Sequence, residues 1–314
     1  MVTALRRKVV SVLLTLLFAS AMVFLITYLV PGDPAVVVAG EQATPEQIAL
    51  VRSELGLDDP IVEQYGRFMW GVLHGDLGTS LFTREPVVDI VARTLPRTME
   101  LVVAGLVVAI AAGIPLGIAA AMRARTATDG VIRAVSTAGL AIPNFWFGLI
   151  LVSIFALEWA VLPATGFVSV FDDPVEGLAH QVLPALAIGL TAMAAIARQT
   201  RSAMIEVLSA DFVRTQRAMG VPGRAIVWQH ALKNASIPVV TIIGLDISRL
   251  IGGAVVVETV FGISGLGGAL VSATTQRDFP VVQGVILVVV FLVVIVNLLI
   301  DVLYTWLDPR IQGV

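Results

Sequence analysis

Six stretches of this chain are apolar enough and long enough to cross a lipid bilayer as helices. A hydrocarbon core about 30 Å thick requires about 20 consecutive, mostly apolar helical residues. Hydrophobic residues make up 57% of the 314 positions and charged residues only 14%, which is more apolar surface than one water-soluble core can bury. We therefore predict an all-helical polytopic membrane protein. The expected spans are Val9–Val30, Met99–Met122, Val131–Leu157, Gln181–Ala197, Ser236–Val257 and Val282–Tyr304.

Basic residues are concentrated in every second loop, and this pattern indicates on which side of the membrane each loop lies. Lys and Arg concentrate in cytoplasmic loops of membrane proteins. They precede the first span, follow the second and fill the loop after the fourth, whereas the loop after the third contains acidic residues and no Lys or Arg. We therefore expect both termini in the cytoplasm. The first apolar run is too long for a cleaved signal peptide, so we expect an uncleaved first span.

Composition divides the chain further. Residues 31–97 shift toward charged residues, Gly and Pro, and predict a small extracytoplasmic helical lobe. The expected organisation is residues 1–30 for the N-terminal end and first span, 31–97 for the lobe, 98–305 for a membrane core of five spans with a cytoplasmic loop at 198–235, and 306–314 for a cytoplasmic tail.

Three short helices are expected in the lobe. Thr44-Pro45-Glu46-Gln47 has the pattern of a helix N-terminus. A second helix is expected after Asp59-Pro60, and its apolar stripe could lie on the outer membrane surface or against the transmembrane helices. The stripe consists of Ile61, Tyr65, Phe68, Met69 and Val72. A third short helix, Pro86–Thr94, is expected to lead into Pro96 and the second span.

The loop between the fourth and fifth spans carries its own helix signals. Asp211 can cap a short helix that runs to Met219, with Gly220 as its C-terminal stop. One expected face consists of Phe212, Thr215, Gln216 and Met219, and the opposite side carries Arg214 and Arg217. Pro222 is expected to start another helix, which carries Trp228 and His230 back toward the fifth span. The alternative is a solvated basic loop that only fixes the topology; the helix signals favour a folded amphipathic segment.

This loop resembles the EAA loop of ABC importer permeases, in which Glu-Ala-Ala is followed after three residues by Gly and, nine residues later, by Ile-x-Leu-Pro. Gly220 stands at the Gly and Leu232 at the Leu of that pattern. Arg214-Thr215-Gln216 replace Glu-Ala-Ala, His230 replaces Ile and Lys233 replaces Pro, departures that resemble the peptide-transporter branch. Gln216 in place of Ala could alter docking, because its side chain is bulkier and polar.

Further blocks extend the resemblance over the whole chain, to the B-type permease subunit of dipeptide and oligopeptide importers, the DppB/OppB family. The blocks occur in family order: Leu29-Val30-Pro31-Gly32-Asp33-Pro34, Leu55-Gly56-Leu57-Asp58-Asp59-Pro60, Gly75-Asp76-Leu77-Gly78-Thr79-Ser80, Arg93-Thr94-Leu95-Pro96-Arg97-Thr98, Ile142-Pro143-Asn144-Phe145-Trp146, Glu258-Thr259-Val260-Phe261, Gly265-Leu266-Gly267 and Leu307-Asp308-Pro309-Arg310. The resemblance implies the type I ABC importer permease fold with six transmembrane helices.

The resemblance also implies a function and partners. It implies half of the pathway of an ATP-driven importer for di- or oligopeptides or similar small solutes, in the plasma or inner membrane of a prokaryote. Such a subunit forms a heterodimer with a homologous C-type permease, two cytoplasmic ABC ATPases use ATP and Mg²⁺ to drive it, and an extracytoplasmic solute-binding protein delivers the cargo. Substrates of related systems include dipeptides, oligopeptides, nickel complexes, haem and glutathione, and the sequence does not choose among them.

Two sets of site residues follow. The ATPase-coupling set implied by the resemblance is Asp211, Phe212, Arg214, Thr215, Gln216, Arg217, Met219, Gly220, His230 and Leu232. The expected translocation-pathway set is Asn144, Phe145, Trp146, Asp246, Arg249 and Glu258. Asp246 and Arg249 are three residues apart near the middle of the fifth span, where charges avoid lipid. They could form an ion pair among the helices or contact a zwitterionic peptide.

The chain lacks a phosphate-binding loop of the G-x-x-x-x-G-K-[ST] type, since neither Lys8 nor Lys233 follows a Gly. Energy must therefore come from a partner or from an ion gradient, and a gradient-driven carrier is the alternative transporter. Buried ionisable residues such as Asp246 and Arg249 are typical of such carriers.

An intramembrane serine protease is the alternative from another class, because Gly262-Ile263-Ser264-Gly265 resembles the rhomboid G-x-S-G. A serine nucleophile needs a base within hydrogen-bond reach. The histidines are His74, His180 and His230, and the last is expected on the other side of the membrane. We expect no catalytic residue. Three dispersed histidines and no cysteine also give no metal-ligand set, and the basic residues, explained by topology, give no nucleic-acid surface.

Overall fold

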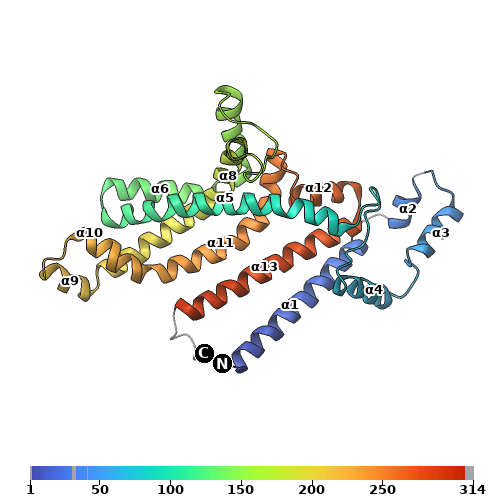
Figure 1. Ribbon diagram of the computed structural model, residues 1–314, viewed down its shortest axis with the longest axis horizontal. Coiled ribbons are helices and arrows are strands. Elements are labelled where there is room, and N and C mark those ends of the chain that lie inside the picture. The colour runs from blue at the N-terminus through green and yellow to red at the C-terminus, as the bar shows by residue number, and fades with distance from the viewer. Residues whose placement is uncertain (1, 30–32, 41, 308–314) are drawn as a thin grey trace. The chain divides into compact units, whose positions relative to one another are not determined.

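The computed structural model describes residues 2–29, 33–40 and 42–307, and within these residues it contains helices but no strand (Figure 1). The chain divides into two compact units. One contains Met1–Thr98 and Ser264–Val294, and the other contains Met99–Ile263 and Ile295–Val314. The predicted blocks at residues 29–34 and 307–310 and the predicted tail at 306–314 lie partly outside the described residues.

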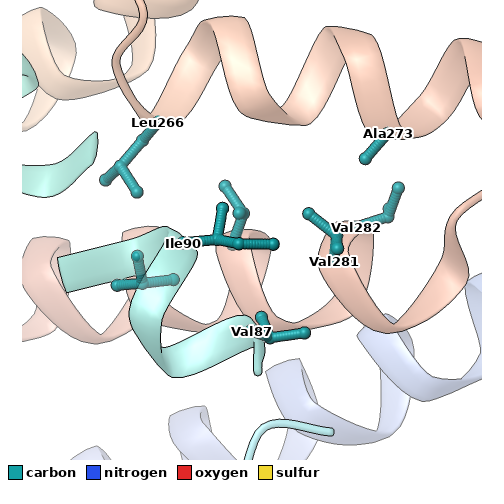
Figure 2. Packing of buried hydrophobic residues seen from close by; sticks show 8 residues of the cluster. Val87, Ile90, Leu266, Ala273, Val281 and Val282 are labelled. Atoms are coloured by element: carbon teal, nitrogen blue, oxygen red, sulfur yellow. The ribbon is translucent and has the colours of Figure 1, made fainter. Parts of the chain in front are cut away.

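The first unit contains the predicted lobe and the helices that hold it. Its elements are α1 (Val2–Leu29), α2 (Pro34–Ala39), α3 (Pro45–Glu54), α4 (Ile61–Leu73), the first part of α5 (Val87–Met122), α12 (Leu266–Gln276) and the first part of α13 (Phe279–Leu307). Figure 2 shows its core, where α5, α12 and α13 bring together Val87, Ile90, Val91, Leu266, Ala273, Val281, Val282 and Val285. The loop before α5 is fastened to the start of α13, because the Ser80 hydroxyl donates to Asp278 Oδ2 (2.5 Å) and the Leu81 N–H donates to Oδ1 (3.1 Å).

Two predictions about the lobe are confirmed. Thr44 and Gln47 form the expected reciprocal capping box at the start of α3. The α4 stripe packs against α1, which decides between the two predicted positions for it. The Phe24 ring of α1 contacts the rings of Tyr65 and Phe68, at centroid distances of 5.4 and 5.8 Å, and the Tyr65 hydroxyl lies 2.8 Å from that of Ser20.

One prediction about the lobe is wrong. The segment Pro86–Thr94 is not a separate short helix, because α5 runs unbroken from Val87 to Met122. A proline removes one backbone N–H from the helix and bends it, but in a membrane helix the freed carbonyl can be satisfied locally. Helix α2 was not predicted; its N-terminus is capped by the Asp33 carboxylate, which accepts the Ala35 N–H (3.0 Å).

The second unit is built around α8 (Pro174–Leu208), which packs against α6 (Ala127–Ala141), α7 (Asn144–Leu151) and α11 (Leu232–Phe261). Between α7 and α8 lie the π-helical segment η1 (Val152–Glu158) and an irregular loop. Glu100 on α5 holds this loop, since its carboxylate accepts the Ser169 hydroxyl (2.7 Å), the Val170 N–H (3.3 Å) and the Gln181 amide (2.9 Å). After α8 the chain continues through α9 (Asp211–Ala218), α10 (Gly223–Ala225) and the π-helical segment η2 (Ile226–Ala231) into α11.

Small residues bring α5 and α8 into backbone contact. A Cβ atom added to Gly113 would lie 2.8 Å from the Met193 carbonyl oxygen, and one added to Gly117 would lie 2.6 Å from the Ala197 carbonyl oxygen and 2.5 Å from Thr200 Cβ. No side chain fits at these distances. In lipid, helix association gains little from the hydrophobic effect and depends on van der Waals packing instead. Small residues favour this packing because they let the two backbones approach closely.

Five helices of the described residues are long and apolar enough to span a membrane, and a sixth span results if one bent pair is counted as a single crossing. The bent pair corresponds to the predicted third span, Val131–Leu157. It is not one straight helix, because α6 and α7 meet at an angle of 106° at Ile142-Pro143. The residue before a proline is sterically driven out of the helical region, and Ile142 has φ −80° and ψ 125°. The all-helical fold class is confirmed, and the predicted boundaries were too short for α8 and α11.

A buried ion pair that the sequence analysis did not predict joins α6 to α8. The Asp129 carboxylate accepts from Arg201 Nε (2.6 Å) and Nη2 (2.8 Å), and the Arg125 N–H also donates to it (3.0 Å). Asp129 is only 2% exposed. Asp129 is the one acidic residue in a basic loop, and this pattern could have indicated an ion pair. It could not have identified Arg201 as the partner, because that residue is far along the chain. The pair fixes the part of α8 that leads into α9.

We predict that Gly117→Ala destabilises the protein and that Gly130→Ala does not. The added methyl group at Gly117 meets the Ala197 carbonyl, whereas nothing lies within 4 Å of a Cβ at Gly130. Overpacking costs roughly 1–3 kcal/mol, and a Gly→Ala change in an open helix position gains up to about 1 kcal/mol. The midpoint of thermal unfolding in detergent measures both changes. Equal midpoints for the two variants would show that α5 and α8 are not in backbone contact.

A second prediction concerns the ion pair. Asp129→Ala and Arg201→Ala should each lower the unfolding midpoint, because each leaves the other charge buried without its partner. The double variant should lose less than the sum of the two single losses, since the remaining charge is then also removed. Additive losses in this double-mutant cycle would show that the two side chains do not interact.

Candidate functional site

The predicted amphipathic helix forms α9, between α8 and the helical segment that leads into α11. Gly220 follows it in the left-handed conformation (φ +78°), which favours glycine. The Gly220 N–H donates to the Arg217 carbonyl (3.0 Å) and the Val221 N–H to the Gln216 carbonyl (3.1 Å), the hydrogen-bond pair of a Schellman motif. The prediction that Gly220 stops this helix is confirmed.

The predicted N-terminal cap is wrong by one residue. Ala210 occupies the cap position and makes no side-chain hydrogen bond, whereas Asp211 is the first helical residue. The Asp211 carboxylate accepts from Arg214 Nη1 (3.3 Å) instead. In the first turn a negative charge still stabilises the helix through its dipole, so the residue favours the helix without capping it.

The structure shows which side of α9 is buried, a point that the sequence left open. Val213 is fully buried, and Gln216, one turn later, is half-buried with its Oε1 atom enclosed and without a hydrogen-bond partner in the described residues. Gln216 therefore does not share an outward face with Phe212, Thr215 and Met219, which are all exposed. Phe212 and Val213 are adjacent apolar residues, so the sequence alone does not decide which of them is buried; the structure buries Val213.

The outward surface of α9 is apolar and basic. Phe212 is 40% exposed and Met219 is 69% exposed, while the side chain of Arg214 is 76% exposed. Arg217 is also exposed. Large exposed apolar side chains and guanidinium groups are typical of protein–protein contacts, and here they lie on opposite sides of a helix whose exposed surface includes both.

The segment after α9 is continuous with the fifth span, whereas a separate helix was predicted. It is helical from Gly223 to Phe261. Ile226, Val227 and Ala231 of η2 are buried, and the last two pack with residues of α5 and α8. His230 and Leu232 are half-buried, and Trp228 is 54% exposed. An open hollow of about 440 Å³ next to α9 is lined by Pro222, Arg224, Ala225, Trp228 and Gln229.

The structure brings together part of the predicted pathway set. Asn144 Oδ1 accepts from the Thr191 hydroxyl (2.7 Å), and the amide of Asn144 faces Gly253 of α11, where an added Cβ would lie 3.9 Å from Nδ2. Thr191 was not among the predicted residues. Asp246 Oδ1 accepts from Arg249 Nη1 (2.9 Å), so the predicted ion pair is present.

The remaining three residues of the predicted set do not complete a cluster. Phe145 and Trp146 are 44% and 50% exposed and follow the bend between α6 and α7. Glu258 is fully buried. At 1.5 Å per helical residue it is about 18 Å along α11 from Asp246, so the six predicted residues do not form one cluster.

Comparison with known proteins gives the family. Residues 113–313 match the family described as binding-protein-dependent transport system inner membrane component, and residues 1–102 match the N-terminal region of the membrane component of such systems. The chain is 38% identical over 330 residues to the dipeptide transport system permease protein DppB of Escherichia coli, covering 98% of this chain and 97% of that protein. It is 39% identical over 313 residues to a putative peptide transport system permease protein of Brucella melitensis, covering 99% of both.

A solved structure shares the fold. A chain from the inward-facing MetNI methionine ABC transporter superposes with a TM-score of 0.57 at 15% identity, covering 70% of this chain and 96% of that one. It supports the type I importer permease fold. The two family matches together cover nearly the whole chain. The apolar helices of the chain agree with a multi-pass protein of the inner membrane. The chain belongs to the inner-membrane permease family of binding-protein-dependent ABC importers, in the branch that resembles DppB and OppB.

Proposed function

We propose that this permease subunit forms half of the translocation pathway for di- or oligopeptides, in a heterodimer with a homologous C-type permease. The relatives from Escherichia coli and Brucella melitensis carry dipeptide and peptide transport names, and they match nearly the full length of this chain. An extracytoplasmic binding protein would deliver the peptide. Two cytoplasmic ATPases would bind and hydrolyse ATP with Mg²⁺, so this chain itself would bind no cofactor and catalyse no reaction.

The observation that carries the mechanism is the geometry of α9. This short helix lies between two membrane helices, ends in a glycine-dependent stop and turns Phe212, Arg214, Arg217 and Met219 outward. Such a surface suits a groove on an ATPase that has an apolar floor and acidic residues at its edge. The hollow beside Trp228 would extend the same contact surface onto η2.

Force applied to α9 would reach the pathway through two connections. Val213 is buried, and α9 packs against η2, which continues without a break into α11. At its other end, α9 follows α8, which is held to α6 by Asp129 and Arg201. Closure of the ATPase pair would therefore reorient α8 and α11, the helices that carry Thr191, Asp246 and Arg249. Such a change between two conformations of the permease requires only that the closed ATPase pair binds one conformation more tightly than the other.

The same proposal fixes the orientation. Because the ATPases are cytoplasmic, α9 and the loop at 198–235 would lie in the cytoplasm, as the basic residues of that loop predict. Both termini would then be cytoplasmic, and the lobe at 31–97 would lie outside, where the binding protein releases its cargo. Residues 98–305 would form the membrane core.

Gly220→Val should reduce peptide uptake several-fold while the ATPases keep hydrolysing ATP, so that less peptide enters per ATP. The left-handed conformation at Gly220 costs a non-glycine residue about 1–2 kcal/mol, and more when the side chain is β-branched. Gly66→Val in α4 is the matched control, because Gly66 has open space and no positive φ and lies outside the proposed contact surface. Uptake and hydrolysis are measured together in proteoliposomes. Normal coupling in Gly220→Val, with normal membrane insertion in both variants, would contradict the role of α9.

The energy source is tested separately. In proteoliposomes containing the complete complex and its binding protein, dipeptide uptake should stop when ATP is removed and should persist when an uncoupler dissipates the ion gradients. The physical reason is that the driving step is nucleotide-dependent ATPase closure. Uptake that survives without ATP and stops with the uncoupler would instead identify a gradient-driven carrier.

A further inference from the structure

One face of α11 is left uncovered by the rest of its unit. Leu245 and Val256 are 47% and 49% exposed, Gly252 and Thr259 are exposed, and the side chain of Arg249 is 66% exposed. These five residues recur at intervals of three and four, so they form a single stripe along the helix. The neighbouring faces are covered, since Ser248 donates to Asn297 of α13 (3.2 Å) and Leu250 and Ala254 are buried.

A guanidinium on this stripe excludes lipid as the surroundings. Arg249 is near the middle of α11, a mostly apolar helix, and a charge at that depth is expensive unless it faces water or other polar groups. Gly252, one turn further along the stripe, has nothing within 4 Å of a Cβ position. The stripe therefore combines a charge with open room, as the wall of an aqueous passage does.

The ion pair with Asp246 is open rather than closed. In a closed pair both carboxylate oxygens would accept from the guanidinium and cover it. Here only Asp246 Oδ1 accepts from Arg249, while Oδ2 is buried without a donor in the described residues. No further hydrogen bond to Arg249 is present among these residues. Asp246 thus holds the guanidinium through one hydrogen bond, and the other N–H groups of Arg249 make no hydrogen bond to the described residues.

Further polar groups lie beside the stripe. Gly253, four residues after Arg249, faces the amide of Asn144, and Asn144 in turn accepts from Thr191. Since Oδ1 of Asn144 is occupied, its amide nitrogen remains a donor. A guanidinium and an amide on adjacent helices are both hydrogen-bond donors to an anion.

We infer that Arg249, positioned by Asp246, is a carboxylate-binding site in the wall of the passage, and that it favours cargo with a free carboxylate over cargo without one. A planar guanidinium matches a carboxylate through two parallel hydrogen bonds. This inference rests on the proposed transport function, because it assigns the α11 stripe to the translocation pathway. Peptides with a free C-terminus have the required group.

The direct test uses a single introduced cysteine, because the chain contains none of its own. Val256→Cys lies on the same stripe as Arg249, about two turns along. In the assembled complex, made with cysteine-free partner subunits, it is labelled with anionic sulfonatoethyl methanethiosulfonate or with the cationic trimethylammonioethyl reagent. Relative to the rates at which the two reagents modify a free thiol in solution, the anionic reagent should be favoured, and Arg249→Gln should reduce its rate about tenfold, since a fixed charge in a narrow passage concentrates counter-ions by a factor of about 10 or more.

Two controls frame this result. Val256→Cys with Arg249→Lys should keep the preference for the anionic reagent, because the charge is retained. Ala254→Cys, fully buried, should not react. The inference would be overturned, whatever the cargo is, if neither reagent labelled Val256→Cys, or if the anionic reagent reacted at the same rate with and without the Arg249→Gln substitution.

A transport measurement separates this inference from the proposed function. The unmodified complex is given a dipeptide and the C-terminal amide of the same dipeptide. Arg249→Gln should lower uptake of the free acid several-fold more than uptake of the amide. Equal losses would mean that Arg249 has only a structural role, and would overturn the inference. Failure of the unmodified complex to take up either compound would count against a peptide substrate, while the cysteine rates would still decide the role of Arg249.

Discussion

Close packing of α8 against its neighbours is the interaction on which the second unit depends. Lipid offers little hydrophobic reward for bringing helices together, so association depends on how closely their backbones can approach. Gly113 and Gly117 of α5 leave no room for a side chain against Met193, Ala197 and Thr200. The Asp129–Arg201 pair adds a polar fastening to α6. With α8 held in this way, the segment that leaves its C-terminus starts from a fixed position.

That fixed position explains how a helix of eight residues can serve as a mechanical contact. Isolated helices of this length are marginal in water, and α9 lacks a side-chain cap. Its order therefore depends on the Schellman motif at Gly220 and on the burial of Val213. Because η2 and α11 form one continuous helical segment with α10, a displacement of α9 has a short path to the polar groups of α11.

The sequence was sufficient for the features that depend on local chemistry or on composition. The apolar runs predicted the membrane helices, Thr44 and Gln47 predicted the start of α3, and Gly220 predicted the end of α9. Features that depend on partners distant in sequence were missed or misplaced. Asp129 could be singled out as the one acid of a basic loop, but not paired with Arg201. Val213 and Gln216 face inward because η2 packs there, and no periodicity in eight residues reveals which neighbour will do so. The bend at Pro143 was open to prediction, since a proline and the residue before it both disfavour a straight helix.

The central claim, that an ATPase grips α9, is tested most directly by cross-linking from Met219. This side chain is exposed, lies next to the Gly220 stop, and can be replaced by the only cysteine of the chain. A photoactivated cross-linker attached to Met219→Cys in the assembled, membrane-embedded complex should capture an ATPase subunit, with a yield that changes between the ATP-bound and nucleotide-free states. If no nucleotide state gives a cross-link to an ATPase subunit while the complex remains active in transport, α9 is not the contact and the account of coupling given above is wrong.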